Sequence, residues 1–528
     1  MNSFHLRLGL IIAAVLLANT AHALAQTTPT QPRQTIAQPS PSPTPRFSYS
    51  VKIRAWDFFR QNASDAAQGG ANKAINQAAF NLGIAPHVEY HIWSGLSAGS
   101  TYQYANPLNG RCDTPQSHSA PPCEAVVPKG QVPSGGTLDF DDSVPGYQLH
   151  TLYEAYITWK DPRVYAKVGN QVINTPWAPD ADSRIKPNAY QGADASYALG
   201  SHWLVQATHI VRFEFRNQSN FSRTTLLTSS PPGAGGIPDN VYNPGGQSIQ
   251  TSGFTMGRLG YTNGSFEANL WHYGFANISH AYWLDGKYTF SSTRFSPYVA
   301  VQMGSERNSG QSVVGKIDSN VYGILGGINV TKNILIEEGY DHIPLRSDTV
   351  ALPHGYTCAA NATISVGAVT ESLPYFLPSG GTGNCTRNAG GTTNLYYGGW
   401  ASPYSDSLAS DPLFTTSLTQ GMVDRRSPGQ SYMTRVTYTP TNRKLVASTT
   451  FADYNYGNPG GAQKTHETDA DVLYYFSKPA ALGQHYRGFT FHYRYGVRFQ
   501  SGSAQPAPTG YGGPPLFKYD RYQLEYDF

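Results

Sequence analysis

The chain from Phe47 to its last residue, Phe528, is built of segments in which apolar and polar residues alternate with a period of two. This alternation predicts β-strands that have one apolar and one polar face. Eighteen segments fit the pattern: 47–59, 78–91, 96–105, 147–159, 163–172, 190–199, 202–216, 252–262, 265–276, 279–290, 293–304, 318–330, 333–341, 431–439, 442–454, 467–476, 488–500 and 518–528.

The connections between these segments alternate in length. The links after even-numbered segments are tight turns, such as Asn263-Gly264, a favoured hairpin pair, except for the longer last link through Pro479 to Arg487. Odd-numbered segments lead into most of the long stretches, including 106–146, 217–251 and 342–430. Short turns on one rim and long loops on the other are typical of outer-membrane barrels. We therefore predict an all-β fold, a transmembrane antiparallel β-barrel of about 18 strands, with periplasmic turns and extracellular loops.

Both ends of the chain fit this architecture. Residues 1–25 have the basic start, the apolar run and the small-residue end of a cleavable signal peptide, and the run is too short to span a bilayer. Residues 26–46 form a Pro-rich tail, which we expect to be periplasmic, and 47–528 form the barrel. The chain ends with Phe528 on an alternating strand, and a terminal aromatic residue of this kind is typical of bacterial outer-membrane barrels. The expected location is the bacterial outer membrane.

Composition favours the same class. Charged residues make up 13% of the chain, Tyr numbers 36 and the mean hydropathy is −0.39, which suits neither an ordinary soluble domain nor a helical membrane protein. The net charge of +3 is too small to indicate a nucleic-acid partner. The expected partners are small-molecule solutes, membrane lipid and lipopolysaccharide. Whether the barrel is a monomer or a trimer stays open.

The four cysteines form two local pairs, each inside one predicted outer loop. Cys112 lies near Cys123, and Cys358 lies near Cys385. Because disulfides persist outside the cytoplasm, we expect two bonds within loops rather than cross-loop pairs or free thiols. Their role would be to stiffen the loops.

One string resembles a catalytic motif. Residues 310–316 copy most of a phosphate-binding loop, but Ile317 stands where Ser or Thr must ligate magnesium. We interpret this string as a plain loop. We expect no catalytic residue, no metal and no cofactor, although a hydrolase with dispersed Ser and His residues stays open as an alternative.

The alternation of side chains along each strand directs a set of basic residues toward the lumen. In the segment 488–500 the aromatic row faces lipid, so the intervening cations face inward, and the first and last segments are neighbours in a closed barrel. One wall then carries Lys52, Arg54, His492, Arg494, Arg498 and Arg521. A second inward set holds Arg212, Arg216 and Arg258, with Glu214 between the first two.

These cations have two interpretations. Any water-filled lumen needs polar side chains, and charges there could simply be solvated. However, clustered like charges repel unless anions compensate them, and rings of charge select ions by sign. We therefore treat both sets as candidate substrate-binding residues.

The stretch from Asn174 to Gly192, NTPWAPDADSRIKPNAYQG, is similar to the Asp-Ser-Arg-hydrophobic-x-Pro-x-x-aromatic-x-Gly stretch of the OprD family of substrate-specific outer-membrane porins. Residues 467–476 and the Arg-bearing segment after Leu482-Gly483 resemble that family's closing hairpin. The resemblance implies eighteen strands, a loop 173–189 that folds inward and narrows the lumen, and an arginine ladder that guides carboxylates. With the loop's mixed charge, it makes these residues the candidate constriction: Asp180, Asp182, Ser183, Arg184 and Lys186.

The resulting hypothesis is a porin for passive diffusion of small hydrophilic solutes that bear a carboxylate, such as amino acids, small organic acids or peptides. A general or sugar-selective porin is one alternative. The other is a barrel-embedded enzyme or an adhesin that uses the long loop 342–430.

Overall fold

The computed structural model describes residues 46–62, 75–109, 149–181, 184–216, 218–228, 248–291, 295–359, 364–366, 375–377, 385–405, 410–423, 427–457, 463–477, 479, 486–501 and 517–528. Eighteen of its strands form one closed sheet. They are β1 (Phe47–Asn62), β2 (Ile75–Trp93), β3 (Leu96–Asn109), β4 (Leu149–Lys160), β5 (Val164–Gln171), β6 (Ala189–Leu199), β7 (Trp203–Glu214), β10 (Phe254–Thr262), β11 (Phe266–Phe275), β12 (Ser279–Thr289), β13 (Tyr298–Asn308), β14 (Asp318–Asn329), β15 (Ile334–Ile343), β21 (Gly429–Tyr438), β22 (Leu445–Tyr456), β23 (Gln463–Tyr475), β24 (Gly488–Ser501) and β25 (Phe517–Asp527).

Each strand pairs antiparallel with its neighbours, and the ring closes between β1 and β25, where Ile53 lies opposite Tyr526. The backbones of Val51 and Phe528 exchange two hydrogen bonds, of 3.1 and 3.2 Å, so the terminal aromatic residue is tied to the first strand. The predicted barrel of eighteen strands is confirmed. Several boundaries were wrong by three to five residues: the segment predicted from residue 293 begins only at Tyr298, and the one predicted from residue 467 already begins at Gln463.

The two faces of the wall alternate as the sequence pattern requires. On β25, Tyr522 and Leu524 are more than 40% exposed, whereas Arg521, which precedes Tyr522, is 1% exposed. An apolar outer face with a polar inner face is the arrangement that lipid on one side and a lumen on the other demand. Among the described residues, no helix is long and apolar enough to cross a membrane.

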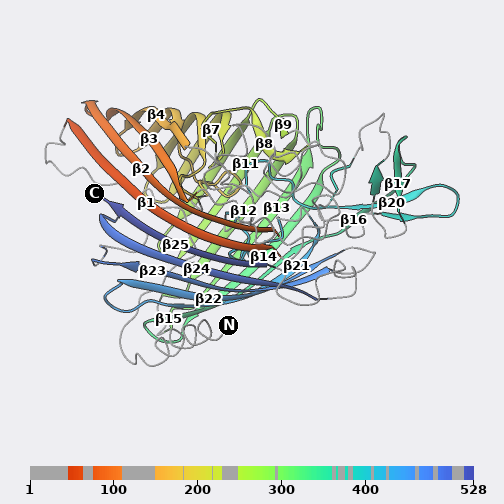
Figure 1. Ribbon diagram of the computed structural model, residues 1–528. Coiled ribbons are helices and arrows are strands. Elements are labelled where there is room, and N and C mark those ends of the chain that lie inside the picture. The colour runs from red at the N-terminus through yellow and green to blue at the C-terminus, as the bar shows by residue number, and fades with distance from the viewer. Residues whose placement is uncertain are drawn as a thin grey trace.

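Seven short strands lie outside the barrel sheet, and the sequence analysis did not predict them. They are β8 (Thr224–Thr228), β9 (Ser248–Gln250), β16 (Arg346–Val350), β17 (Tyr356–Cys358), β18 (Ile364–Val366), β19 (Cys385–Arg387) and β20 (Thr393–Tyr397). The last five belong to the connection between β15 and β21, and we call the described residues among 346–397 the outer subdomain. Figure 1 shows β16, β17 and β20 beyond the end of the barrel that lies away from the C-terminus.

The outer subdomain has its own small core. A disulfide joins Cys358 to Cys385, which confirms one of the two predicted pairs. Cys112 and Cys123 lie outside the described residues. Leu395 and Ile364 pack beside the disulfide, and the Lys316 ammonium, at the end of the P-loop-like string, lies 2.6 Å from the Asp348 carboxylate. That string is a loop, as predicted, and its lysine anchors the subdomain.

Candidate functional site

Apolar residues fill one side of the lumen. A continuous cluster of buried side chains runs over the inner face of β6, β7, β10–β15, β21 and β22, and includes Tyr190, Phe254, Trp271 and Tyr454. A second, much smaller cluster surrounds Trp56 on the opposite part of the ring. The inner face around β25, β1 and their neighbours therefore carries much less buried apolar surface.

Two chain segments fold inward from the outer rim. One is the loop 172–188 between β5 and β6, and the other, which we call the inner segment, comprises residues 400–405 and 410–423 between β20 and β21. They meet where Trp177 stacks on Trp400 with ring centroids 4.7 Å apart, and Trp283 of β12 packs edge-on against Trp177 at 5.0 Å. Both stacked rings are 0% exposed. The family resemblance implied inward folding for the first segment, but nothing in the sequence analysis indicated the second.

The predicted basic wall forms across β23, β24, β25 and β1. Arg494 lies opposite Arg521, and Asp471 of β23 lies opposite Arg494. The Asp471 carboxylate accepts a hydrogen bond from Arg494 Nε at 2.8 Å and lies 2.6 Å from His492 Nε2. The sequence analysis missed this acidic member, although the parity of β23 would have pointed it inward.

A second carboxylate, Glu525 of β25, holds two cations of β1. Arg54 Nη2 lies 2.7 Å from Glu525 Oε2, and Lys52 Nζ lies 3.5 Å from Glu525 Oε1. Arg54 is 4% exposed, while the Lys52 side chain is 41% exposed. Lys52 is thus the member of this group that water or a solute reaches most easily.

The loop 172–188 touches the basic wall at Trp56. The guanidinium carbons of Arg184 and Arg521 lie 5.9 and 5.8 Å from the indole ring centre, within the range of cation–π attraction. The Arg184 carbonyl also accepts a hydrogen bond from Arg54 Nη1 at 2.6 Å. Ile185 from the loop and Leu418 from the inner segment both pack in the Trp56 cluster. The basic wall, the loop 172–188 and the inner segment therefore meet around Trp56.

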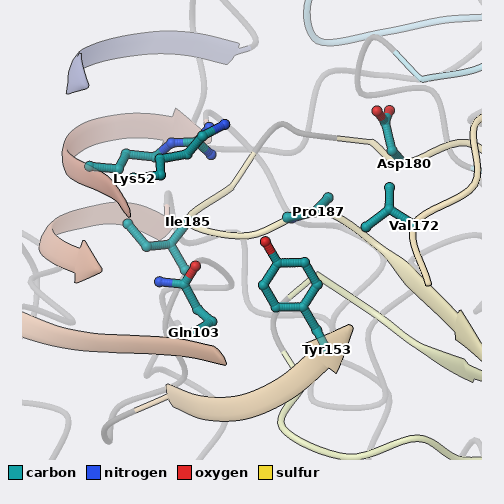
Figure 2. A pocket seen from close by; sticks show the side chains of 8 residues that line it. Lys52, Gln103, Tyr153, Val172, Asp180, Ile185 and Pro187 are labelled. Atoms are coloured by element: carbon teal, nitrogen blue, oxygen red, sulfur yellow. The ribbon is translucent and has the colours of Figure 1, made fainter. Parts of the chain in front are cut away.

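Beside this contact lies a cavity of about 160 Å³. Figure 2 shows Lys52 and Asp180 on opposite sides of it, with Tyr153 and Pro187 between them. The complete lining is Lys52, Arg54, Gln103, Tyr153, Val172, Asp180, Ile185 and Pro187. A cation and a carboxylate thus face one space that a small polar solute could occupy.

The remaining predicted site residues lie elsewhere. Lys186 is fully buried, 3.0 Å from Glu214, and does not line the cavity. Burial lowers the pKa of its ammonium, and the Glu214 carboxylate opposes that shift. Asp182 and Ser183 lie outside the described residues. Arg498 belongs to the basic wall and donates from Nη1 to the Thr419 carbonyl at 3.4 Å.

The second predicted basic set does not come together. Arg216 is buried over the Phe215 ring, at 4.3 Å, and Arg258 lies over Trp271, at 4.6 Å, within the apolar side of the lumen. A bulge in the pairing of β6 with β7 breaks the parity after Ile210, and Arg212 beyond it is exposed. A bulge adds one residue to one strand, so the side chains beyond it face the opposite side from the one that simple alternation predicts.

A closed ring of eighteen antiparallel strands, with outer loops folded inward and a basic inner wall, is the architecture of an outer-membrane porin. No protein-family model matches the sequence, and no curated protein matches it. Several solved structures are similar to this chain. OccK9 (OpdG) of Pseudomonas aeruginosa superposes with a TM-score of 0.58 at 13% identity over 91% of this chain and 98% of that one.

Two further structures are similar to the same degree. OccAB3 of Acinetobacter baumannii has a TM-score of 0.58 at 12% identity, over 91% of this chain and 99% of that one. OpdK of P. aeruginosa, solved with vanillate, has a TM-score of 0.57 at 12% identity, over 91% and 98%. These proteins are OprD-type porins, so the fold that the loop motif implied is confirmed.

Proposed function

We propose that the chain is a passive porin of the bacterial outer membrane for small hydrophilic solutes that bear a carboxylate. The observation that supports this most directly is the placement of Lys52 and Arg54 on the wall of a cavity beside the inward loop. These residues belong to the larger basic wall, so a carboxylate leaving the cavity meets further cations.

The stretch of this wall that holds Lys52, Arg54, Arg494 and Arg521 carries more cations than carboxylates among its described contacts: Glu525 contacts Lys52 and Arg54, and Asp471 contacts Arg494. Glu467 and Asp469 of β23 lie further along the wall, toward Arg498. An excess of fixed positive charge lowers the barrier for an anion that loses part of its hydration shell in a narrow passage. A neutral sugar would gain nothing from it.

The ligands seen in similar barrels fit this chemistry. OpdK was solved with vanillate, and OccK2 (OpdF) of P. aeruginosa with glucuronate. Both molecules carry a carboxylate. For this chain the solute class remains a proposal that rests on its own basic wall.

Planar-bilayer recording of the purified protein tests both parts of the proposal. We expect ion conductance, and a reversal potential across a KCl gradient that indicates preference for the anion. Liposome-swelling rates should be higher for a small organic acid than for a neutral sugar of equal size. Equal rates would favour a general porin instead, and no conductance at all would contradict the porin function.

A further inference from the structure

The inner segment is bonded to the barrel through side chains of the wall. The backbone N–H of Thr415 donates to Asp341 Oδ2 at 2.7 Å, and that of Leu418 donates to Asp469 Oδ2 at 2.7 Å. The Thr419 N–H donates to Glu467 Oε1 at 2.6 Å. Earlier in the segment, the Ala401 N–H donates to Glu306 Oε2 at 2.7 Å. Four carboxylates, from β13, β15 and β23, thus accept main-chain N–H groups of one segment.

Hydroxyl groups strengthen two of these contacts. Thr415 Oγ1 donates to Asp341 at 2.7 Å, and Thr419 Oγ1 donates to Glu467 at 2.6 Å. The Tyr454 hydroxyl of β22 accepts from the Ser417 N–H at 3.0 Å and donates to the Thr415 carbonyl at 2.6 Å. The run from 415 to 419 is therefore satisfied largely by the wall, as a strand would be satisfied by its neighbour.

The carboxylates depend on the segment in turn. Glu306, Asp341 and Glu467 are 0% exposed, and Asp469 is 5% exposed. A buried carboxylate is costly unless hydrogen bonds replace its water, and bonds from N–H groups to an ionised acceptor are the strong kind. A segment that left the lumen would break such bonds at several positions together. Its removal is therefore opposed by the loss of these hydrogen bonds at four positions together.

We infer that Glu306, Asp341, Glu467 and Asp469 are positioning residues, which hold the inner segment in a fixed place inside the barrel, beside the loop 172–188. The inference rests on the proposed porin function. The fixed position matters because Leu418 packs in the Trp56 cluster, where the loop 172–188 meets the basic wall. The four carboxylates shape the passage without lining it.

The first test is conductance. Glu467→Gln and Asp341→Asn retain the size of each side chain but replace the anionic acceptor, and we expect larger single-channel conductance from both, because the segment loosens. Glu338→Gln is the matched control, since Glu338 lies on β15 near Asp341 but is exposed and accepts a hydrogen bond from Thr434 at 2.8 Å. Conductance equal to wild type in both test variants would overturn the inference.

The second test does not depend on ion conductance. Ser417→Cys places a thiol where the side chain is 3% exposed, and its rate of maleimide labelling reports departure of the segment from the wall. Adding Glu467→Gln should accelerate labelling about tenfold or more, as expected for the loss of hydrogen bonds to a charged group. An unchanged labelling rate would overturn the inference. Absence of ion conductance would contradict only the porin function, so the two failures are distinguishable.

A milder variant guards against misfolding. Thr419→Val removes one hydroxyl donor and leaves every wall residue in place, so the barrel should assemble and show heat-modifiable migration. We expect a smaller acceleration of labelling in the same direction. Labelling as slow as in the parent would show that the hydrogen bond from the Thr419 hydroxyl to Glu467 does not hold the segment.

Discussion

Arg494 and Arg521 lie directly opposite each other on β24 and β25, and Asp471 lies opposite Arg494 on the other side. Like charges on facing positions of a sheet destabilise it. The Asp471 carboxylate, bonded to Arg494 and 2.6 Å from His492, offsets that repulsion. The barrel can therefore keep two facing arginines on its inner wall and still assemble.

Replacing Arg494 with Gln should lower anion preference and the uptake of carboxylate solutes, because one of the wall cations is lost. The change is measured as a reversal potential across a KCl gradient. Arg494 is a cleaner choice than Arg498, which also donates to the Thr419 carbonyl of the inner segment. Arg212→Gln, at an exposed position of β7, should leave the potential unchanged. Equal potentials in wild type and Arg494→Gln would mean that this arginine is only solvated lining.

Asp471→Asn should act in the opposite direction on selectivity. It removes a negative charge from the basic wall, so anion preference should rise while stability falls by about 1–2 kcal/mol through the loss of charged hydrogen bonds. Reversal potentials and the temperature at which the band loses heat-modifiable migration report the two effects separately. A drop in anion preference would contradict the assigned role of the carboxylate.

Ile185→Ala should widen the passage where the loop meets Trp56, since Ile185 is 3% exposed and packs in that small cluster. We expect higher single-channel conductance with a local loss of about 2–5 kcal/mol. Ile173→Ala removes the same atoms from the same loop, but on the apolar side of the lumen, and should change conductance much less. If both variants conduct alike, the constriction is not at Ile185.

The anchor of the outer subdomain should respond to acid and to strong base. The hydrogen bond from Lys316 lowers the pKa of Asp348, and the same contact raises the pKa of Lys316. The lowered pKa of Asp348 means that its contribution is present above about pH 4 and is lost as the pH falls further. The raised pKa of Lys316 means that its contribution is present below about pH 10 and is lost above its folded value.

A label on Ala389→Cys, at the exposed turn between β19 and β20, would report this loosening as a fall in fluorescence anisotropy. The effect is small, up to about 1 kcal/mol, because the pair is partly exposed. Asp348→Asn should abolish the pH dependence and keep the anisotropy low throughout. Identical titrations in the two proteins would show that another contact anchors the subdomain.

Opening the Cys358–Cys385 disulfide by a double Ser substitution should make the outer subdomain more sensitive to protease. A loop with a separation of 27 residues contributes about 3 kcal/mol when closed. Channel conductance should change little, since the disulfide lies outside the barrel. Peptide mapping of the unreduced wild type should also find the predicted Cys112–Cys123 bond.

The barrel could be predicted from the sequence because each of its strands meets lipid on one face and the lumen on the other. That requirement gives every strand a period of two, and the period alone predicts that Arg54, Arg494 and Arg521 share one wall. The same rule misplaced Arg212, because the bulge between β6 and β7 leaves no mark in the alternation.

The inner segment could not be predicted in this way. Residues such as Thr415 and Thr419 obtain their backbone partners from carboxylates far away in sequence, so no local period records their position. The strands of the outer subdomain are three to five residues long and lie in Gly- and Ser-rich sequence, which is too short for a period to show. Only the loop 172–188 gave a signal, through its similarity to a known family.

The apolar filling on one side of the lumen has a consequence for how such a barrel can vary. Under the proposed porin function, the bore of the passage would depend on inward side chains and on two inward segments as well as on the number of strands in the ring. Smaller side chains at Trp271 or Leu325 would widen the open cross-section, while the hydrogen bonds between the strands of the ring stay the same. Solute size range and mechanical strength are therefore separate properties of this protein, and each is free to change alone.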